Sequence, residues 1–197
     1  MISLQQLQSL VSHGEIDTVV IALTDMQGRL MGKHVTADFF MGEVVPHGAE
    51  GCNYLLAVDT DMRTVGGYAL SSWASGYGDF VMKPDLATLR LAPWLEKTVL
   101  VQCDLEDHAG IGVLPSPRQI LKAQLERLHA RGLTALAATE LEFILFKDSY
   151  EAAWKKAYRD LEPFNYYNVD YSILGSSRAE PVIGRIRREM TKAGLVV

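Results

Sequence analysis

The sequence predicts an α+β protein, because segments with helical periodicity and segments with the pattern of strands both occur along it. Residues 3–14 carry leucines at helical intervals, residues 16–36 form a β-rich run with a turn in the middle, and residues 98–105 (TVLVQCDL) have the pattern of a buried strand. Hydrophobic residues make up 48% of the 197 positions, which is enough for the core of one large or two small domains.

The first part of the chain is expected to form a helix, a hairpin and a long loop. Gly14 suits the left-handed position that follows a helix, and Gly28 belongs to the turn signal of the hairpin. Residues 51–95 interleave glycine with aromatic residues such as Trp73 and Tyr77, which is typical of a structured loop packed on a neighbouring surface.

A helix with recognisable ends is expected at residues 116–132. Ser116 is a good N-cap, Pro117 suits the first turn and Gly132 suits the stop. The stretch before it, EDHAGIGVLP (106–115), is a connector in which we expect a domain boundary. The buried stripe of this helix is expected to consist of Ile120, Leu121, Leu125 and Leu128.

The rest of the chain is expected to form a strand at 138–146, a helix at 149–161, irregular structure at 164–174 and a helix at 180–194. The closing residues AGLVV follow a helix stop at Gly194 and have the pattern of the entry to another buried strand. We therefore expect the terminus to be a cut in a longer chain. The inward face of the last helix is expected to carry Val182, Ile183, Ile186 and Met190.

Composition argues against several classes of function. The formal net charge is −5 and there is no long basic run, so nucleic acid is not expected as a partner. Cys52 and Cys103 belong to no Cys-x-x-Cys or Cys/His cluster and indicate ordinary thiols in a reducing compartment. The N-terminus lacks the pattern of a secretory signal, and no apolar stretch approaches the roughly 20 residues that cross a bilayer. We therefore expect a cytoplasmic protein without membrane contact.

Two glutamates lie in the otherwise apolar stretch ATELEFILF (138–146). Because side chains alternate along a strand, Glu140 and Glu142 would share one face. Burying two unpaired like charges is costly, so the pair needs a compensating environment. A bound metal, a lysine or arginine from elsewhere, or water at an open sheet face would each provide one.

Several stretches together resemble the glutamine synthetase family, in particular its divergent γ-glutamyl ligase branch. Gly-Asp followed by Lys-Pro-Asp, Thr-Leu-Arg and Pro-Trp, in this order ahead of Glu-x-Glu, makes the resemblance specific. It extends over essentially the whole chain, which corresponds to the N-terminal portion of such an enzyme. The matching stretches are DMQGRLMGK (25–33), GYGDFVMKPDLATLRLAPW (76–94), PRQILKAQLERL (117–128) and ATELEFILF (138–146).

The resemblance implies an N-terminal β-grasp domain at residues 1–108. At residues 109–197 it implies the first part of a catalytic domain with a curved antiparallel sheet and helices. Glu140 and Glu142 would then bind the divalent metals, Mg²⁺ or Mn²⁺, that hold ATP and activate glutamate. In the implied reaction ATP phosphorylates the side-chain carboxylate of glutamate, and ammonia or an amine displaces phosphate from the resulting acyl phosphate.

In this family the β-grasp domain completes the active site of the adjacent subunit, within a homo-oligomeric ring that commonly forms two stacked hexamers. The family's Asp-Gly-Ser-Ser loop, which helps to hold the incoming ammonium, is absent here. Residues 57–73 stand in its place and offer Asp59 and Asp61 as the candidate catalytic residues for the ammonium or amine, with Arg63 beside them. This departure is compatible with a bulkier amine than ammonia.

The family's other metal ligands, its glutamate-binding segment and its phosphoryl-binding arginines correspond to positions beyond Val197. Two carboxylates do not fill two metal shells of roughly six oxygens each, so we expect this polypeptide alone to be inactive. Two interpretations stay open. The chain is either an N-terminal piece of a ligase, or a short non-catalytic β-grasp protein with a subunit-binding or regulatory role.

Overall fold

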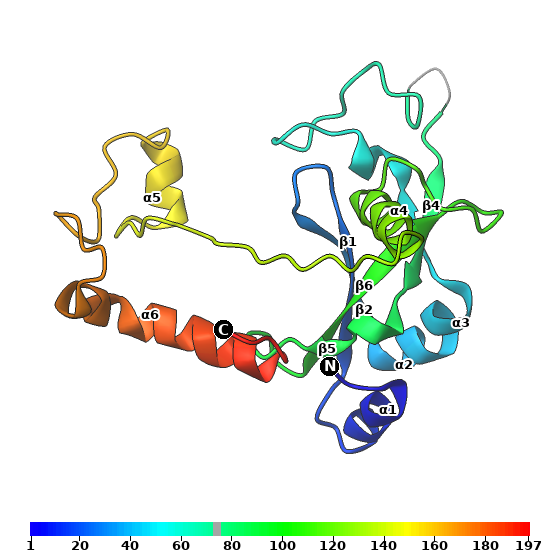
Figure 1. Cartoon of the computed structure of the whole chain (residues 1–197), viewed down its shortest axis with the longest axis horizontal. Coiled ribbons are helices and arrows are strands. Elements are labelled where there is room, and N and C mark those ends of the chain that lie inside the picture. Colours follow the sequence, from blue (N-terminus) through cyan, green and yellow to red (C-terminus); the bar gives the residue numbers. More distant parts are fainter. Residues whose placement is uncertain (73–75) are drawn as a thin grey trace. The chain divides into compact units, whose positions relative to one another are not determined.

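A mixed six-stranded sheet organises the first part of the chain, in a computed structural model that describes residues 1–72 and 76–197 (Figure 1). The strand order is β2-β1-β6-β4-β3, and β5 pairs with β6. Trp73, which the sequence assigns to a structured loop, lies outside the described residues. The strands are β1 (Thr18–Thr24), β2 (Leu30–Thr36), β3 (Ala49–Cys52), β4 (Asp79–Pro84), β5 (Arg90–Leu91) and β6 (Thr98–Glu106).

The two central strands, β1 and β6, run parallel, whereas the other paired strands run antiparallel. Residues 18–22 lie beside residues 98–102 in register. A parallel pair needs a long crossover connection. The chain between β1 and β6 provides this connection, and it also contributes the remaining strands of the sheet.

The core is formed by alternate residues of the central strands and by helices packed against them. Leu7 of α1 (Leu4–Ser12) and Phe40 and Val44 of the π-helix η1 (Phe40–Val44) are fully buried in it. Side chains at every second strand position point to one face, which explains the spacing of the buried residues. The core residues of β1 and β6 are Val19, Ile21, Leu23, Val99, Val101, Cys103 and Leu105.

The helix ends follow from local sequence. At α1, the Ser3 hydroxyl accepts a hydrogen bond from the Gln6 backbone at 3.2 Å and the Gln6 side chain accepts one from the Ser3 backbone at 2.7 Å. This reciprocal pair satisfies amide groups that the first turn leaves free. Gly14 and Gly132 both have φ of 70°, as expected after helices. The other helical elements of this part are α2 (Ala37–Phe39), α3 (Val45–His47), η2 (Asn53–Leu56), η3 (Leu86–Thr88) and α4 (Pro117–His129).

The predicted opening helix, hairpin, buried strand at 98–105 and helix at 116–132 are confirmed. The assignment of residues 51–95 to a loop is wrong in part, because β4 and β5 fall inside this range. Phe80 and Met82 of β4 are buried at alternate positions, yet the strand is short and ends at a proline. A pattern of that length between glycine-rich flanks is hard to separate from a loop.

Residues 136–188 form a second compact unit, distinct from the unit of residues 1–135 and 189–197. It holds α5 (Tyr150–Lys155) and most of α6 (Ile173–Lys192). The predicted helix at 149–161 is shorter than expected because Ala157 and Tyr158 both adopt positive φ, which a continuing helix does not allow. A bridge between Phe146 and Pro163 links the two arms that flank α5.

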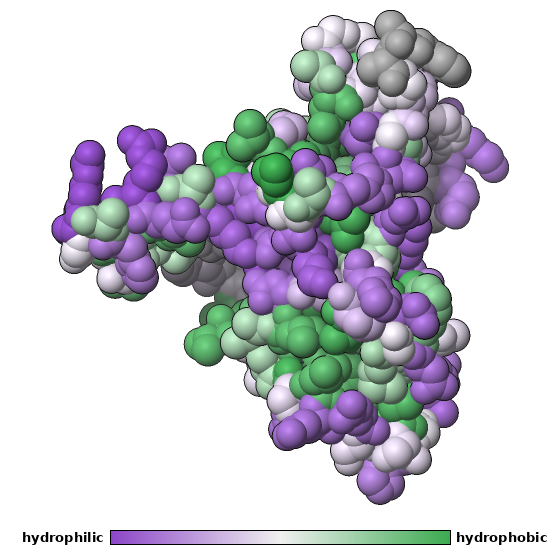
Figure 2. Space-filling view, turned by 90° about the vertical axis from the view of Figure 1, so that its right-hand side faces the viewer, coloured by the Kyte–Doolittle hydropathy of each residue, from purple (hydrophilic) through white to green (hydrophobic). Residues whose placement is uncertain are grey.

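The predicted buried stripes of the helices are wrong. Ile120 is 47% and Leu121 58% exposed on α4, and Val182 and Ile186 are exposed on α6. Apolar residues reach the surface elsewhere as well, as the face drawn in Figure 2 shows. An amphipathic pattern reports which face of a helix is apolar, but it does not report whether the described residues supply a partner for that face. Within residues 1–72 and 76–197, the structure contains no helix with the length and apolar character that crossing a membrane requires.

The turn of the β1–β2 hairpin is held by a buried aspartate. Asp25 is fully buried, and its Oδ2 accepts a hydrogen bond from Nε of Arg29 at 2.7 Å. Its Oδ1 accepts the backbone N–H groups of Gln27 at 2.9 Å and Arg29 at 2.8 Å. Burial by itself raises the pKa of Asp25, but the hydrogen bonds from Arg29 and Gln27 outweigh burial and hold this pKa below its ordinary range.

Removing the charge of Asp25 should therefore destabilise the fold. We expect Asp25→Asn to lower the free energy of unfolding at pH 7 by about 1–3 kcal/mol, since Arg29 loses its partner but stays partly hydrated. Because the folded-state pKa is depressed, the stabilisation is present above the unfolded pKa of about 3.9 and is lost as pH falls through the lower folded-state value. Urea unfolding from pH 7 to pH 3 measures both effects.

In that series the difference between wild type and Asp25→Asn should shrink as the pH falls below about 4. Glu15→Gln, at an exposed carboxylate, is the control and should change stability little. A difference between wild type and Asp25→Asn that stays constant down to pH 3 would contradict a charged Asp25 in the folded state.

The two cysteines should differ in reactivity. Burial raises the pKa of the Cys103 thiol to about 12, whereas Cys52 is only half-buried. Because the thiolate is the reactive form, we expect iodoacetamide at pH 8 to modify Cys52 and leave Cys103 unmodified in the folded protein. Mass spectrometry of labelled peptides measures this, and equal labelling in urea is the control. Modification of Cys103 at a rate similar to that of Cys52 would contradict its burial.

Candidate functional site

Asp59 and Asp61, the candidate residues for the amine, lie in a tight loop that follows η2. The loop closes on itself, because the Asp59 backbone donates to the carbonyl of Arg63 at 3.0 Å and Val58 forms a bridge with Thr64. Val65 donates from its backbone to the Ala57 carbonyl at 3.0 Å. Residues 57–65 therefore form a small ordered hairpin, which we call the acidic loop.

The two aspartates have different environments in the acidic loop. Oδ1 of Asp59 accepts backbone hydrogen bonds from Asp61 and Arg63, both at 2.9 Å, so this carboxylate shapes the turn. The Asp61 carboxylate is 70% exposed and lies 4.0 Å from the Arg63 guanidinium, which is also exposed. An exposed pair at that distance contributes little to stability. Asp61 is thus the residue of the two whose carboxylate is more available to a ligand.

Glu140 and Glu142 lie outside any regular element. The structure has no helix or strand at residues 133–145, so the predicted strand at 138–146 is wrong apart from the isolated bridge at Phe146. Both glutamates are exposed, and the intervening Leu141 is 83% exposed. A strand needs a neighbour for its N–H and C=O groups, and among the described residues no strand pairs with residues 138–144; the Leu145 carbonyl accepts one backbone hydrogen bond, from Phe164 at 2.9 Å.

Of the environments that the sequence left open for the two carboxylates, the structure has the solvent-exposed one. In the described part of the chain, no group of three or more His, Cys, Asp or Glu residues is placed to hold a metal ion. The role of Glu140 and Glu142 as metal ligands stays a prediction. Asp59 and Asp61 belong to the first compact unit, and Glu140 and Glu142 belong to the second.

A charged network that the sequence did not predict fixes the start of α4 to the sheet. Arg118 donates to Oδ1 of Asp104 and to Oε1 of Gln102, both at 2.8 Å, and pairs with Asp85. Lys122, one turn further along α4, pairs with the other oxygen of Asp104. Asp85 also accepts the Ala87 backbone N–H at 3.1 Å, so its carboxylate caps the turn that follows it.

The residues that pair in this network are distant in sequence, so no local sequence pattern could predict it. Arg118 is mostly buried, so its ion pairs are stronger than those on an open surface. The network positions the helix that begins at Pro117, immediately after the expected domain boundary. Its chemistry is structural, since each of these charges already has a partner of opposite sign.

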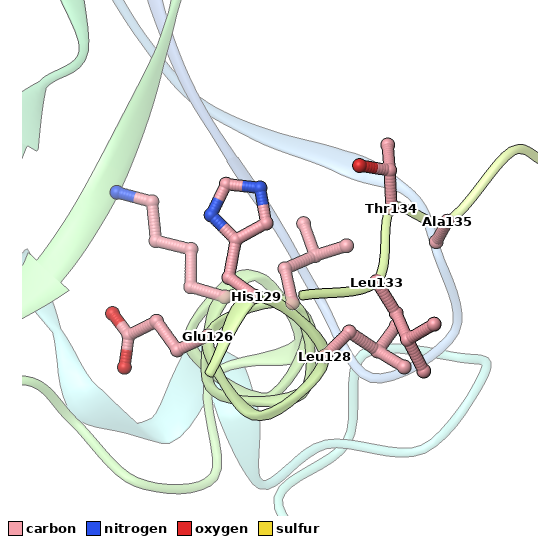
Figure 3. Close-up of a pocket in the computed structure, with 8 residues that line it drawn as sticks. Glu126, Leu128, His129, Leu133, Thr134 and Ala135 are labelled. Atoms are coloured by element: carbon pink, nitrogen blue, oxygen red, sulfur yellow. The ribbon is translucent and has the colours of Figure 1, made fainter. Parts of the chain in front are cut away.

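A cavity of about 500 Å³ lies at the C-terminal end of α4. Figure 3 shows its lining: Leu128 and Leu133 lie together, while Glu126 and His129 point away from them. Its polar side chains do not converge on a common point, and its exposed lining is largely apolar. The cavity is an apolar groove beside the exposed face of α4, not an assembled catalytic centre.

Comparison with known proteins gives the context for these residues. The family described as the glutamine synthetase catalytic domain matches residues 115–197. Gamma-glutamylethanolamide synthetase of Streptomyces coelicolor is 59% identical over 196 residues, which are 100% of this chain and 42% of that protein. A glutamate–isopropylamine ligase from a Pseudomonas species is 32% identical over 98% of this chain and 42% of its own length.

A solved GmaS–ADP complex has a similar fold, with a TM-score of 0.61 at 18% identity over 94% of this chain and 38% of that chain. The chain thus spans about two fifths of the length of these relatives. The matches agree with the motifs at residues 76–94 and 138–146, and the chain belongs to the glutamine synthetase family.

Proposed function

We propose that this chain is part of an ATP-dependent ligase that joins an amine to the γ-carboxylate of glutamate through a γ-glutamyl phosphate. The observation that carries the proposal is the 59% identity, over the full chain, with an enzyme named for making γ-glutamylethanolamide. The second relative is named for isopropylamine, so both named acceptors are primary amines larger than ammonia. We therefore infer a primary amine as the acceptor, in the cytoplasm, where ATP and glutamate are available.

We propose a β-grasp domain at residues 1–108 and the start of the catalytic domain at residues 109–197. The strand order β2-β1-β6-β4-β3 with a parallel central pair supports the first assignment. The family match that begins at residue 115 supports the second. The connector at 106–115 joins the two parts, and the Arg118 network lies immediately after it.

Glu140 and Glu142 are the proposed metal ligands. Carboxylate oxygens are the donors that Mg²⁺ and Mn²⁺ prefer, and both side chains are exposed and accessible to a cation. Further ligands must come from residues outside the described part of this chain, because these two glutamates provide too few oxygens. When bound, the metals would neutralise the phosphoryl oxygens of ATP during transfer to glutamate.

The acidic loop is the proposed site for the incoming amine. A protonated primary amine is a cation, and the exposed Asp61 carboxylate offers it a partner of opposite charge. Asp59 acts on the same ligand through the shape that it gives the loop. By the family resemblance, the loop serves the active site of a neighbouring subunit in a ring of identical chains.

A non-catalytic role is the second candidate, because no third metal-binding side chain lies beside Glu140 and Glu142 among the described residues. In that case the chain would act by binding ligase subunits. Co-expression of this 197-residue chain with the complete ligase, followed by a tag pulldown, tests it. If the 197-residue chain enters the ligase ring but has no ligase activity of its own, the binding role is favoured. Failure of the chain to co-assemble with the ligase counts against that role.

The ligase proposal predicts activity for the product of the complete reading frame that contains these residues. We expect phosphate release from ATP that requires both glutamate and a primary amine, with ethanolamine or isopropylamine turned over faster than ammonia. Coupled phosphate detection measures the rates, and mass spectrometry identifies the γ-glutamyl amide. Release of phosphate that ignores the amine would contradict the proposal.

Changing either proposed metal ligand should separate metal chemistry from folding. We expect Glu140→Gln and Glu142→Gln each to lower kcat by about 100-fold or more, since a lost ligand weakens charge neutralisation in the transition state. Higher Mg²⁺ or Mn²⁺ concentrations should partly restore the rate. Glu96→Gln, at an exposed glutamate, is the control and should keep wild-type kinetics. Wild-type rates in both variants would remove these residues from the metal site.

A further inference from the structure

The tip of the β1–β2 hairpin reaches across to the acidic loop through side chains. Nη1 of Arg29 donates to the carbonyl of Thr60 at 2.9 Å, and Nη2 approaches the carbonyl of Asp59 at 3.5 Å. Gln27 adds a hydrogen bond from Nε2 to the carbonyl of Val58 at 3.0 Å. These contacts join segments about thirty residues apart in sequence. The backbone of the acidic loop is thus held from outside the loop itself.

Asp25 makes Arg29 a rigid support. The guanidinium is fixed by Nε to Oδ2 of the buried Asp25 at 2.7 Å, while its far edge faces the loop carbonyls. Nη2 also lies 3.2 Å from Oε1 of Gln27 and 3.3 Å from Sδ of Met62. A planar guanidinium with a partner at each of its three nitrogens has little freedom to rotate, so movement of the loop requires breaking several contacts together.

The contacts act on the segment that carries the candidate amine residues. Thr60 lies between Asp59 and Asp61, and its carbonyl is the one bonded by Nη1. Asp59 uses one carboxylate oxygen to close the turn, so the loop has its own local closure and needs an external anchor to fix its place on the sheet. Arg29 and Gln27 provide that anchor without contributing a group to the proposed amine.

We propose that Arg29, held by Asp25, is a positioning residue that sets the geometry of the acidic loop and hence the affinity for the amine. The inference rests on the proposed function, because it assigns the loop to the acceptor. Arg29 does not touch the amine. It acts through the backbone of Asp59 and Thr60, so its loss affects the step in which the acceptor binds, while ATP and glutamate bind elsewhere.

The chemistry requires arginine at this position. Lysine carries a single ammonium on a flexible stem and cannot bond Asp25 and the loop carbonyls in one plane. Arg29→Lys therefore keeps the charge and most of the side-chain volume while losing the geometry. Lys33, exposed on β2 of the same hairpin, provides the control Lys33→Ala, which removes a positive charge near the turn without touching the acidic loop.

The first measurement is hydrogen exchange of peptides covering residues 57–65 in the complete protein. We expect Arg29→Ala and Arg29→Lys to raise exchange of these amides about tenfold, because the loop opens more often. Peptides from β6 and the Lys33→Ala variant should exchange as in wild type. Unchanged exchange in the loop in both Arg29 variants would overturn the anchoring role, whatever the enzyme activity. If β6 also exchanges faster in Arg29→Ala, that variant is unfolding generally. Exchange of the loop in Arg29→Lys then decides whether Arg29 anchors it.

The second measurement is steady-state kinetics with ethanolamine, isopropylamine and ammonia. We expect both Arg29 variants to raise the KM for the amine about tenfold, with the KM for ATP and for glutamate within about twofold of wild type. A purely structural defect would lower activity for all substrates together. If hydrogen exchange of the acidic loop rises in the Arg29 variants but the KM for the amine is unchanged, the role of Arg29 in acceptor binding is overturned. An inactive wild type would reject the proposed function and the acceptor role, while hydrogen exchange would still decide whether Arg29 anchors the loop.

Discussion

The parallel pairing of β1 with β6 is the constraint on which the rest of the first compact unit depends. It brings residues 18–22 beside residues 98–102, about eighty positions later in the chain. Every other strand then attaches to one of these two, directly or through β4, and the alternate residues of both form the core. Pairing β1 with β6 closes a long loop, which costs conformational entropy. This cost is offset only when the apolar face that the two strands form together is buried. The chain between β1 and β6, which includes the acidic loop, is thereby attached to the sheet at both of its ends.

Charged side chains then fix the acidic loop and α4 to this frame. At one place Asp25 and Arg29 hold the acidic loop, and at another Arg118 joins α4 to Asp85 and Asp104. Both use an arginine that bonds several oxygens at once, a geometry that lysine cannot reproduce. In each case a carboxylate of low exposure supplies the countercharge. Segments without regular structure can be positioned in this way, since the contacts go to backbone carbonyls or to strand ends and do not need further strand pairing.

Local pattern predicted the elements whose causes are local. These are the helix stop at Gly14, the hairpin around Gly28 and the alternating strand β6, which follow from neighbouring residues alone. The short strand β4 was missed. The contacts of Arg29 to the acidic loop and of Arg118 to the sheet could not be foreseen, because their partners lie 14 to 33 positions away. The sequence pattern correctly identified which residues form the apolar faces of α4 and α6. The prediction that these faces are buried was wrong. Of the candidate site, the sequence supplied the residue types at positions 59, 61, 140 and 142, but not the surroundings that decide which of them meets a ligand.

At Glu140 and Glu142, the proposed metal site depends on the backbone conformation of residues 138–146. Alternation puts both carboxylates on one face only if a neighbouring strand holds the residues around them extended, and no described strand pairs with residues 138–144. Without that pairing, water solvates the two charges and the apolar Leu141 and Phe143 stay exposed. If a partner strand covered the apolar face, the two carboxylates would be brought together, and their mutual repulsion would then favour a cation between them. Formation of such a strand and binding of a metal would then be coupled: the cation would offset the repulsion that strand formation creates, and strand formation would provide the paired ligands that the proposed metal needs.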